Sequence, residues 1–124
     1  MINVTVLVDS KQNYTGIEML GHAGLADDHQ DGQELVCAAV SALTLNMANS
    51  VEQFTDDAFE ADMDEETGLF KFRFAQGFSS ESKLLMNSLV FGLEDIAETY
   101  GEPYIKIRFK ESPPHVCSGE NKEV

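Results

Sequence analysis

Basic residues are scarce in this sequence of 124 amino acids: 8 Lys and Arg stand against 22 Asp and Glu, giving a formal net charge of −14. A surface that binds nucleic acid needs clustered Lys and Arg to contact the phosphates. The sequence therefore disfavours nucleic acid as a direct ligand, and it disfavours an anionic membrane surface for the same reason. The charge instead favours basic partners or basic peptide substrates.

Cysteine is also scarce, since the chain has only Cys37 and Cys117, which excludes a disulfide framework. No CxxC motif or His/Cys cluster indicates a metal site, because the His115 and Cys117 pair near the C-terminus provides too few ligands. We therefore expect neither a metal nor a cofactor.

Targeting signals are absent from the N-terminal stretch MINVTVLVDS, which has neither the basic region nor the long apolar run of a signal peptide. No window reaches the ~18 apolar residues of a membrane span, so we expect no membrane association. These absences favour a cytoplasmic, reducing location. In that setting a prominent cysteine is a candidate thiolate rather than half of a disulfide.

Hydrophobic periodicity predicts a single domain over residues 1–110, followed by a disordered tail over 111–124. Alternating apolar residues favour strands, and apolar residues at three- to four-residue spacing favour helices. Ser79 or Ser80 is the expected cap of the second helix, and the acidic run 56–66 is interpreted as a solvated hairpin tip. The predicted elements are strands over 2–9 and 14–22, a helix over 33–54, a hairpin over 58–76, a helix from about 80 to 100 and a strand over 103–110.

The order ββαββαβ predicts a two-layer α/β sandwich of the α+β type. A mostly antiparallel sheet of about five strands would carry both helices on one face, because each element has one apolar side to bury. The apolar stripes and alternating apolar positions predict that these residues face the core: Val4, Val6, Phe54, Phe72, Tyr100 and Phe109. The opposite sheet face is expected to be solvated, with basic side chains paired with acidic ones. Its outward residues are the bases Lys71, Arg73, Lys106, Arg108 and Lys110 and the acids Glu18, Glu60 and Asp62.

Two residues can together form a reactive site: His22 at the end of the second predicted strand and Cys37 in the early turns of the first predicted helix. A helix N-terminus favours negative sulfur, and a neighbouring imidazole can take the thiol proton to form an ion pair. Cys37 lies about six residues beyond the expected cap at Asp31, so His22 would provide most of the activation. Glu34, Cys37 and Ser41 share one helix face. Glu34 can orient the imidazole there, and Ser41 can bond to the base or the substrate.

Each of these residues also has a purely structural interpretation. Cys37 lies in an Ala- and Val-rich helix and can be an inert core residue, while the small residues beside it can serve close helix packing. His22 can be a hydrogen-bonded structural residue, and Glu34 can simply cap its helix. His29, in the loop between them, is a weaker candidate for the base.

The motifs around His22 and Cys37 resemble those of the ribosomal-processing cysteine protease family, Prp. This chain has GHAG at 21–24, a polar loop, and GQELVCAAVSAL at 32–43. The family pattern is GHA, a loop, G-x-D-x-V-C-A and a Ser four residues after the Cys. The resemblance covers nearly the whole chain apart from the tail, and the order ββαββαβ also resembles the family's small homodimeric α/β domain.

The resemblance implies that Cys37 is the nucleophile, that His22 is its general base and acid, and that Gly21 and Ser41 shape the site. Glu34 occupies the position of the family's Asp, and the loop between His22 and Cys37 is a few residues longer than usual. In the implied mechanism the Cys37 thiolate attacks the scissile carbonyl and His22 protonates the departing amine. Water then hydrolyses the thioester, and backbone N–H groups near the helix start hold the oxyanion.

The implied activity is that of a cysteine endopeptidase that removes an N-terminal extension from a large-subunit ribosomal protein. Ribosomal proteins are basic, which agrees with the net charge of −14. The alternative is a non-catalytic, dimeric, acidic assembly or binding factor for basic ribosomal proteins, in which Cys37 only packs and His22 is structural. A second alternative is acyl transfer or deamidation by the same two residues.

Overall fold

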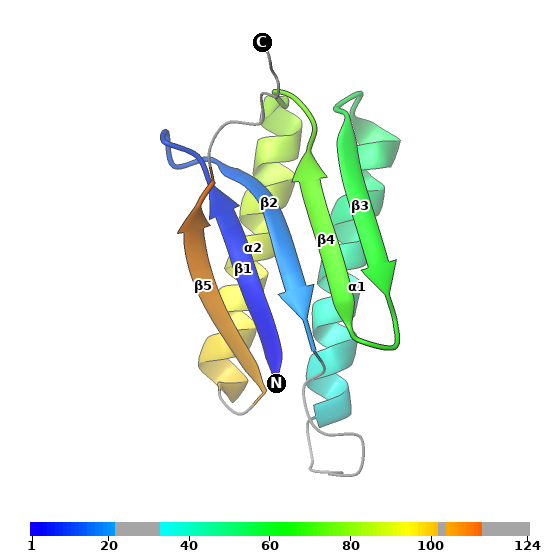
Figure 1. Ribbon diagram of the computed structural model, residues 1–124, viewed down its shortest axis with the longest axis vertical. Coiled ribbons are helices and arrows are strands. Elements are labelled where there is room, and N and C mark those ends of the chain that lie inside the picture. The colour runs from blue at the N-terminus through cyan, green and yellow to red at the C-terminus, as the bar shows by residue number, and fades with distance from the viewer. Residues whose placement is uncertain (22–32, 102–103, 113–124) are drawn as a thin grey trace.

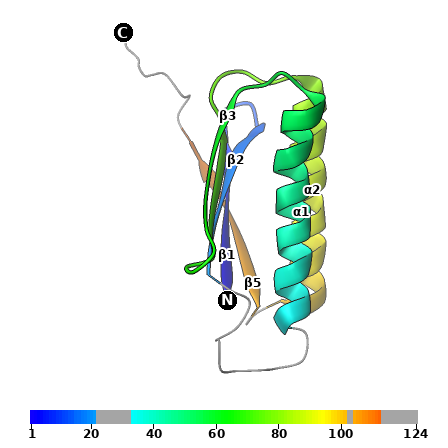
Figure 2. The same cartoon turned by 90° about the vertical axis from the view of Figure 1, so that its right-hand side faces the viewer.

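A computed structural model describes residues 1–21, 33–101 and 104–112 of the chain. Five strands form one sheet, and two helices cover one of its faces (Figure 1, Figure 2). The two layers and the order ββαββαβ are those predicted from the sequence. The elements are β1 (Ile2–Val8), β2 (Tyr14–Leu20), α1 (Gln33–Phe54), β3 (Phe59–Asp64), β4 (Leu69–Phe74), α2 (Ser80–Tyr100) and β5 (Ile105–Glu111).

The strands lie in the order β3-β4-β2-β1-β5. Three of the four neighbouring pairs are antiparallel, which confirms the mostly antiparallel sheet, and β5 pairs with β1 in parallel. The parallel pair follows from the connection through α2, because a helical crossover carries the chain back to the end of the sheet where the preceding strand began. β5 runs through Glu111, so the predicted tail over 111–124 begins inside a strand. Residues 113–124 lie outside the described part.

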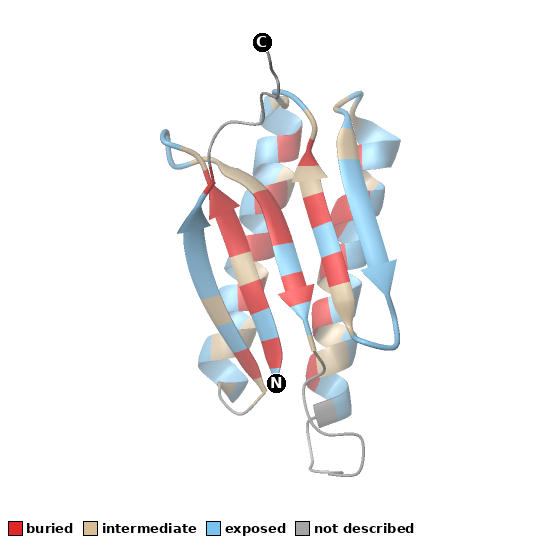
Figure 3. Ribbon diagram, in the orientation of Figure 1, coloured by how far each residue is buried: buried red, intermediate tan, exposed pale blue. Residues whose placement is uncertain are grey.

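The core lies between the sheet and the helices, and alternate residues of the central strands point into it (Figure 3). Val4, Val6 and Phe72, all predicted to face inward, are at most 1% exposed. Along α2, Met86 and Val90 are buried beside the predicted stripe. The two layers therefore close over one shared core, as the amphipathic pattern requires.

Three residues that were predicted to face the core are exposed instead. Phe54 is 74% exposed and Tyr100 is 38% exposed, because each is the last residue of its helix and no following helical turn covers it. Phe109 is 48% exposed on the edge strand β5 and contacts only the ring of Tyr14 among the described aromatic side chains, with centroids 6.0 Å apart. Hydrophobic periodicity identifies the face of an element that packs on the core. It does not show how far along the element that packing extends.

The open sheet face carries the basic residues where the sequence predicted them. The register places Lys71 of β4 opposite Glu18 of β2 and Asp62 of β3. It also places Arg73 opposite Glu60. Facing charges of opposite sign on neighbouring strands are stabilising, so this part of the sheet is the expected solvated, charge-paired face.

Helix α1 is long and apolar enough to cross a membrane when judged only by length and composition. Its apolar stripe packs on the sheet, however, and Val36, Val40 and Val51 are at most 3% exposed. A stripe that covers a sheet is typical of the core helix of a folded domain.

The start of α2 is fixed by a hydrogen-bond network around Asp57, in the link between α1 and β3. Ser79 caps the helix as predicted, since its hydroxyl oxygen accepts a hydrogen bond from the Ser82 N–H at 3.2 Å. The Asp57 carboxylate accepts hydrogen bonds from the Ser79 hydroxyl at 2.6 Å, from the Ser79 N–H at 3.0 Å and from the Ser82 hydroxyl. These donors, led by the Ser79 hydroxyl, lower the pKa of Asp57 below its ordinary value of 3.8.

Replacing Asp57 with Ala should lower the free energy of unfolding by about 1–2 kcal/mol at neutral pH. The reason is that three donors, two on the helix cap Ser79 and one on Ser82, would lose their acceptor. The lowered pKa of Asp57 means that its contribution is complete above 3.8 and is lost as the pH falls through the folded-state value. Urea unfolding at several pH values measures both effects. A difference between the two proteins that stays constant down to strongly acidic pH would contradict this role of the carboxylate.

Candidate active site

Helix α1 brings Cys37 and Ser41 to the wall of a pocket of about 380 Å³. The two residues are one helical turn apart, so their side chains point the same way. Cys37 packs on the edge of the core and is half-buried, while Ser41 is exposed. The sulfur therefore lies where a molecule in the pocket can meet it, and it is not sealed among aliphatic side chains.

The opposite wall of the pocket is the turn that joins β3 to β4. Figure 1 shows this turn at the same end of the sheet as the start of α1 and the end of β2. Asp64, Glu65 and Gly68 contribute to the wall from the turn and its flanks. The rest of the lining is mostly apolar and consists of Ile2, Met19, Gly21, Val40, Thr44, Leu45, Met63, Leu69 and Phe70.

Gly21, the residue before His22, is held at the pocket edge by backbone contacts on two sides. Its φ of 102° lies in the left-handed region, and a Cβ at this position would lie 2.5 Å from the Met1 carbonyl oxygen. The Gly21 N–H donates a hydrogen bond to the Thr67 carbonyl oxygen at 3.2 Å. Gly68, with a φ of 72°, packs so closely that a Cβ there would overlap the Gly21 carbonyl. The β3–β4 turn thus fixes the point from which the chain continues to His22.

The described residues bring together three of the five residues that the sequence assigned to the site. Cys37, Ser41 and Gly21 line the same pocket. Glu34 is exposed in the first turn of α1 and does not line it. His22 lies outside the described residues.

Further residues considered in the sequence analysis, His29, Asp31, His115 and Cys117, also lie outside the described part. Within that part, no three His, Cys, Asp or Glu side chains are placed to hold a metal ion.

A larger cavity, of about 690 Å³, opens at the opposite end of the sheet. Among the described residues, its lining includes Lys11, Arg73 and Lys83 but no cysteine. A nucleophilic thiol is the chemical group that the sequence analysis singles out, so the smaller pocket beside Cys37 is the candidate active site.

The N-terminus of α1 by itself would stabilise a thiolate at Cys37 only weakly. Cys37 is four residues after Gln33, the first residue of α1. Unpaired N–H groups and the positive end of the helix dipole act mainly within the first turn. A thiolate at this position therefore needs a base beside the pocket, and the residue that follows Gly21 in the sequence is His22.

The β3–β4 turn was not predicted to be part of the site. The sequence analysis interpreted the acidic run 56–66 as a solvated hairpin tip, yet Asp64 and Glu65 line the pocket opposite Cys37. The hydrophobic pattern gave the hairpin and its turn correctly. The pattern carries no signal for the packing of that turn against Gly21, which depends on two backbone segments far apart in the sequence.

Comparisons with known proteins show which family the chain is similar to. The family model described as cysteine protease Prp matches residues 1–106. The ribosomal processing cysteine protease Prp of Bacillus subtilis is 31% identical over 104 residues, which cover 81% of this chain and 90% of that protein.

Two solved structures from S. aureus are also similar. One is an essential ribosomal processing protease Prp in complex with a substrate peptide, and it is 27% identical with a TM-score of 0.79. The other is the same protease with a covalently linked product peptide, and it is 28% identical with a TM-score of 0.78. Each match covers 89% of this chain and 100% of the solved chain.

Proposed function

The chain belongs to the cysteine protease Prp family and is a cysteine peptidase, and on that premise we propose that Cys37 is its nucleophile and His22 its general base and acid. The observation that carries the proposal is the pocket that has Cys37 on one wall and Gly21, the residue before His22, on its edge. The covalently linked product peptide in the S. aureus relative supports a nucleophilic mechanism. Family membership supports this reading over the non-catalytic binding factor.

In the proposed reaction His22 takes the Cys37 proton, and the thiolate attacks the carbonyl carbon of the scissile peptide bond. The carbonyl oxygen becomes an oxyanion held by backbone N–H groups near the start of α1. The C–N bond breaks as His22 gives its proton to the departing amine, which leaves a thioester on Cys37. His22 then takes a proton from water, the hydroxide attacks the thioester, and the second product leaves as a carboxylic acid while the thiol is restored.

The proposed substrate is an N-terminal extension on a large-subunit ribosomal protein, removed in the cytoplasm. The relatives are named for ribosomal processing, and this supports the proposed substrate. The charge supports it as well, because a protein of net charge −14 attracts a basic ribosomal protein and associates with it faster.

We assign supporting roles to three residues of the motif. Gly21 gives the backbone the left-handed conformation and close approach that precede His22. Ser41, on the pocket wall one turn after Cys37, contacts the substrate or the base. Glu34 caps the start of α1, which agrees with its exposed position in the first turn.

A trimming assay with the ribosomal protein from the same organism tests this proposal. The full-length protein, with its extension, is incubated with the enzyme, and the new N-terminus is read by mass spectrometry. Cleavage at one position is expected, and a substrate that already lacks the extension should stay intact as the control. No cleavage, or release of ammonia from glutamine side chains in place of chain cleavage, would contradict the peptidase assignment to this substrate.

We also propose that the protein acts as a homodimer. Large exposed apolar side chains on the two helices support this, because Leu35, Leu84 and Phe91 are 59%, 69% and 77% exposed. A second copy that covers these side chains would remove them from water. The molar mass measured by light scattering should be twice that of the 13.7 kDa chain, and the mass of one chain at micromolar concentration would contradict the dimer.

A further inference from the structure

The wall of the pocket opposite Cys37 is acidic. Asp64 ends β3 and Glu65 begins the turn to β4, and both line the pocket. No Lys, Arg or His belongs to the lining in the part of the chain that the structure describes. Among the described lining residues, a positively charged group that enters the pocket therefore meets carboxylates and no Lys, Arg or His.

The two carboxylates have capacity for a further partner. The Glu65 side chain makes no hydrogen bond or ion pair with the residues that the structure describes. Asp64 accepts a hydrogen bond from the Glu66 N–H through Oδ1 at 3.1 Å, which shapes the turn and leaves Oδ2 available. Both side chains are exposed.

Two apolar side chains in the lining of this pocket are exposed to solvent. Met63 is 55% exposed and Leu45 is 39% exposed, and both line the same pocket. Exposed apolar side chains beside carboxylates fit a ligand that has an apolar group and a positive charge close together. An extended peptide with an apolar residue near a basic one is such a ligand.

We infer that Asp64 and Glu65 form an acidic rim that selects a basic side chain in the substrate, close to the scissile bond. The inference rests on the proposed function, since it places the scissile carbonyl at Cys37 across the same pocket. A Lys or Arg side chain can reach a carboxylate while its stem lies on the apolar wall formed by Met63.

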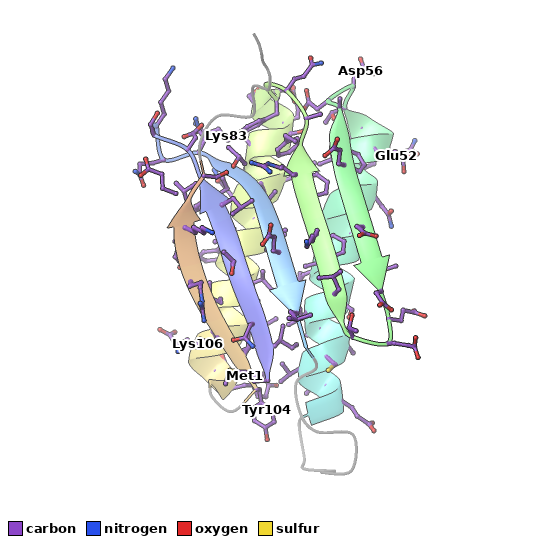
Figure 4. The ribbon with its side chains drawn as sticks, viewed as in Figure 1. Met1, Glu52, Asp56, Lys83, Tyr104 and Lys106 are labelled. Atoms are coloured by element: carbon purple, nitrogen blue, oxygen red, sulfur yellow. The ribbon has the colours of Figure 1, made fainter. Side chains whose placement is uncertain are left out.

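Short-range selection differs from the general attraction between an acidic enzyme and a basic substrate. General attraction depends on net charge and changes equally when any two carboxylates are removed. Selection by the rim depends on Asp64 and Glu65 alone. Glu52 and Asp56 provide the matched control, because both are exposed and Figure 4 labels them at the end of the molecule opposite the β3–β4 turn.

The experiment compares three enzymes on one set of peptides. The enzymes are the wild type, the rim variant Asp64→Asn/Glu65→Gln and the control variant Glu52→Gln/Asp56→Asn. Asn keeps the oxygen that accepts from Glu66, so the turn is retained. The peptides span the cleavage site of the ribosomal protein from the same organism and carry either lysine or acetyl-lysine at each flanking position in turn.

At one flanking position the wild type and the control variant should prefer lysine over acetyl-lysine by about fivefold in kcat/KM. The rim variant should lose that preference, and salt should weaken the preference of the wild type. Glu65→Gln alone, which disturbs no hydrogen bond among the described residues, should lose part of it.

Two outcomes overturn the inference while the proposed function stands: the wild type shows no preference at any position, or the preference falls equally in the rim and control variants. Failure of the wild type to cleave any peptide overturns the proposed function, and the inference with it.

Discussion

Replacing Cys37 with Ser should lower kcat/KM for the ribosomal substrate by at least about 10,000-fold. A hydroxyl stays protonated where a thiol beside an imidazole ionises, so the attacking anion is lost while the shape of the side chain is kept. Cys37 is half-buried at the edge of the core and Ser has nearly the same shape, so the free energy of unfolding should change little. Trimming rates and urea unfolding of the same preparations measure both effects.

The matched control is Cys117→Ser, which removes the other cysteine of the chain and should leave the trimming rate unchanged. Normal trimming by the Cys37→Ser protein would exclude Cys37 as the nucleophile. The result would then support the alternative in which this residue only fills space in the helix.

Replacing His22 with Ala should lower kcat/KM by about 100- to 10,000-fold, the range expected when a general base and acid is removed. Both proton transfers of the proposed reaction pass through this imidazole, so acylation and thioester hydrolysis should both slow. Rapid-quench measurements, followed by mass spectrometry of the enzyme, separate the two steps. Added imidazole should restore part of the rate if the loss is one of proton transfer.

His29→Ala is the control for this experiment, because His29 is seven residues after His22 in the sequence and is the weaker candidate for the base. A larger loss in His29→Ala than in His22→Ala would reassign the base. Equal, small losses in both variants would contradict a catalytic role for either histidine.

The sequence predicted the fold well because hydrophobic period reports directly on burial. Val4, Val6 and Phe72 were assigned to the core from alternation alone, and all are buried. Phe54 was assigned to the core by the same rule and is exposed, because it ends its helix and no following helical turn covers it. Hydrophobic periodicity describes a single helix or strand. How far a helix and a sheet contact each other depends on the length and position of both.

The site was predicted only as far as local motifs allow. The spacing of Cys37 and Ser41 placed both on one helix face, and both line the pocket. The role of the β3–β4 turn was not predictable in this way. Gly68 meets Gly21 through backbone contacts between segments that are 47 residues apart in the sequence, and neither residue has a side chain that signals the contact.

The alkylation rate of Cys37 by iodoacetamide most directly tests whether this sulfur is a reactive thiolate open to a peptide. The measurement uses the Cys117→Ser protein, so that only one thiol reacts, and compares it with the same protein carrying His22→Ala. Fast alkylation near neutral pH that slows markedly without His22 is the predicted result. Slow alkylation of both proteins would contradict it, because a thiol closed off by packing neither meets a reagent nor responds to a distant imidazole.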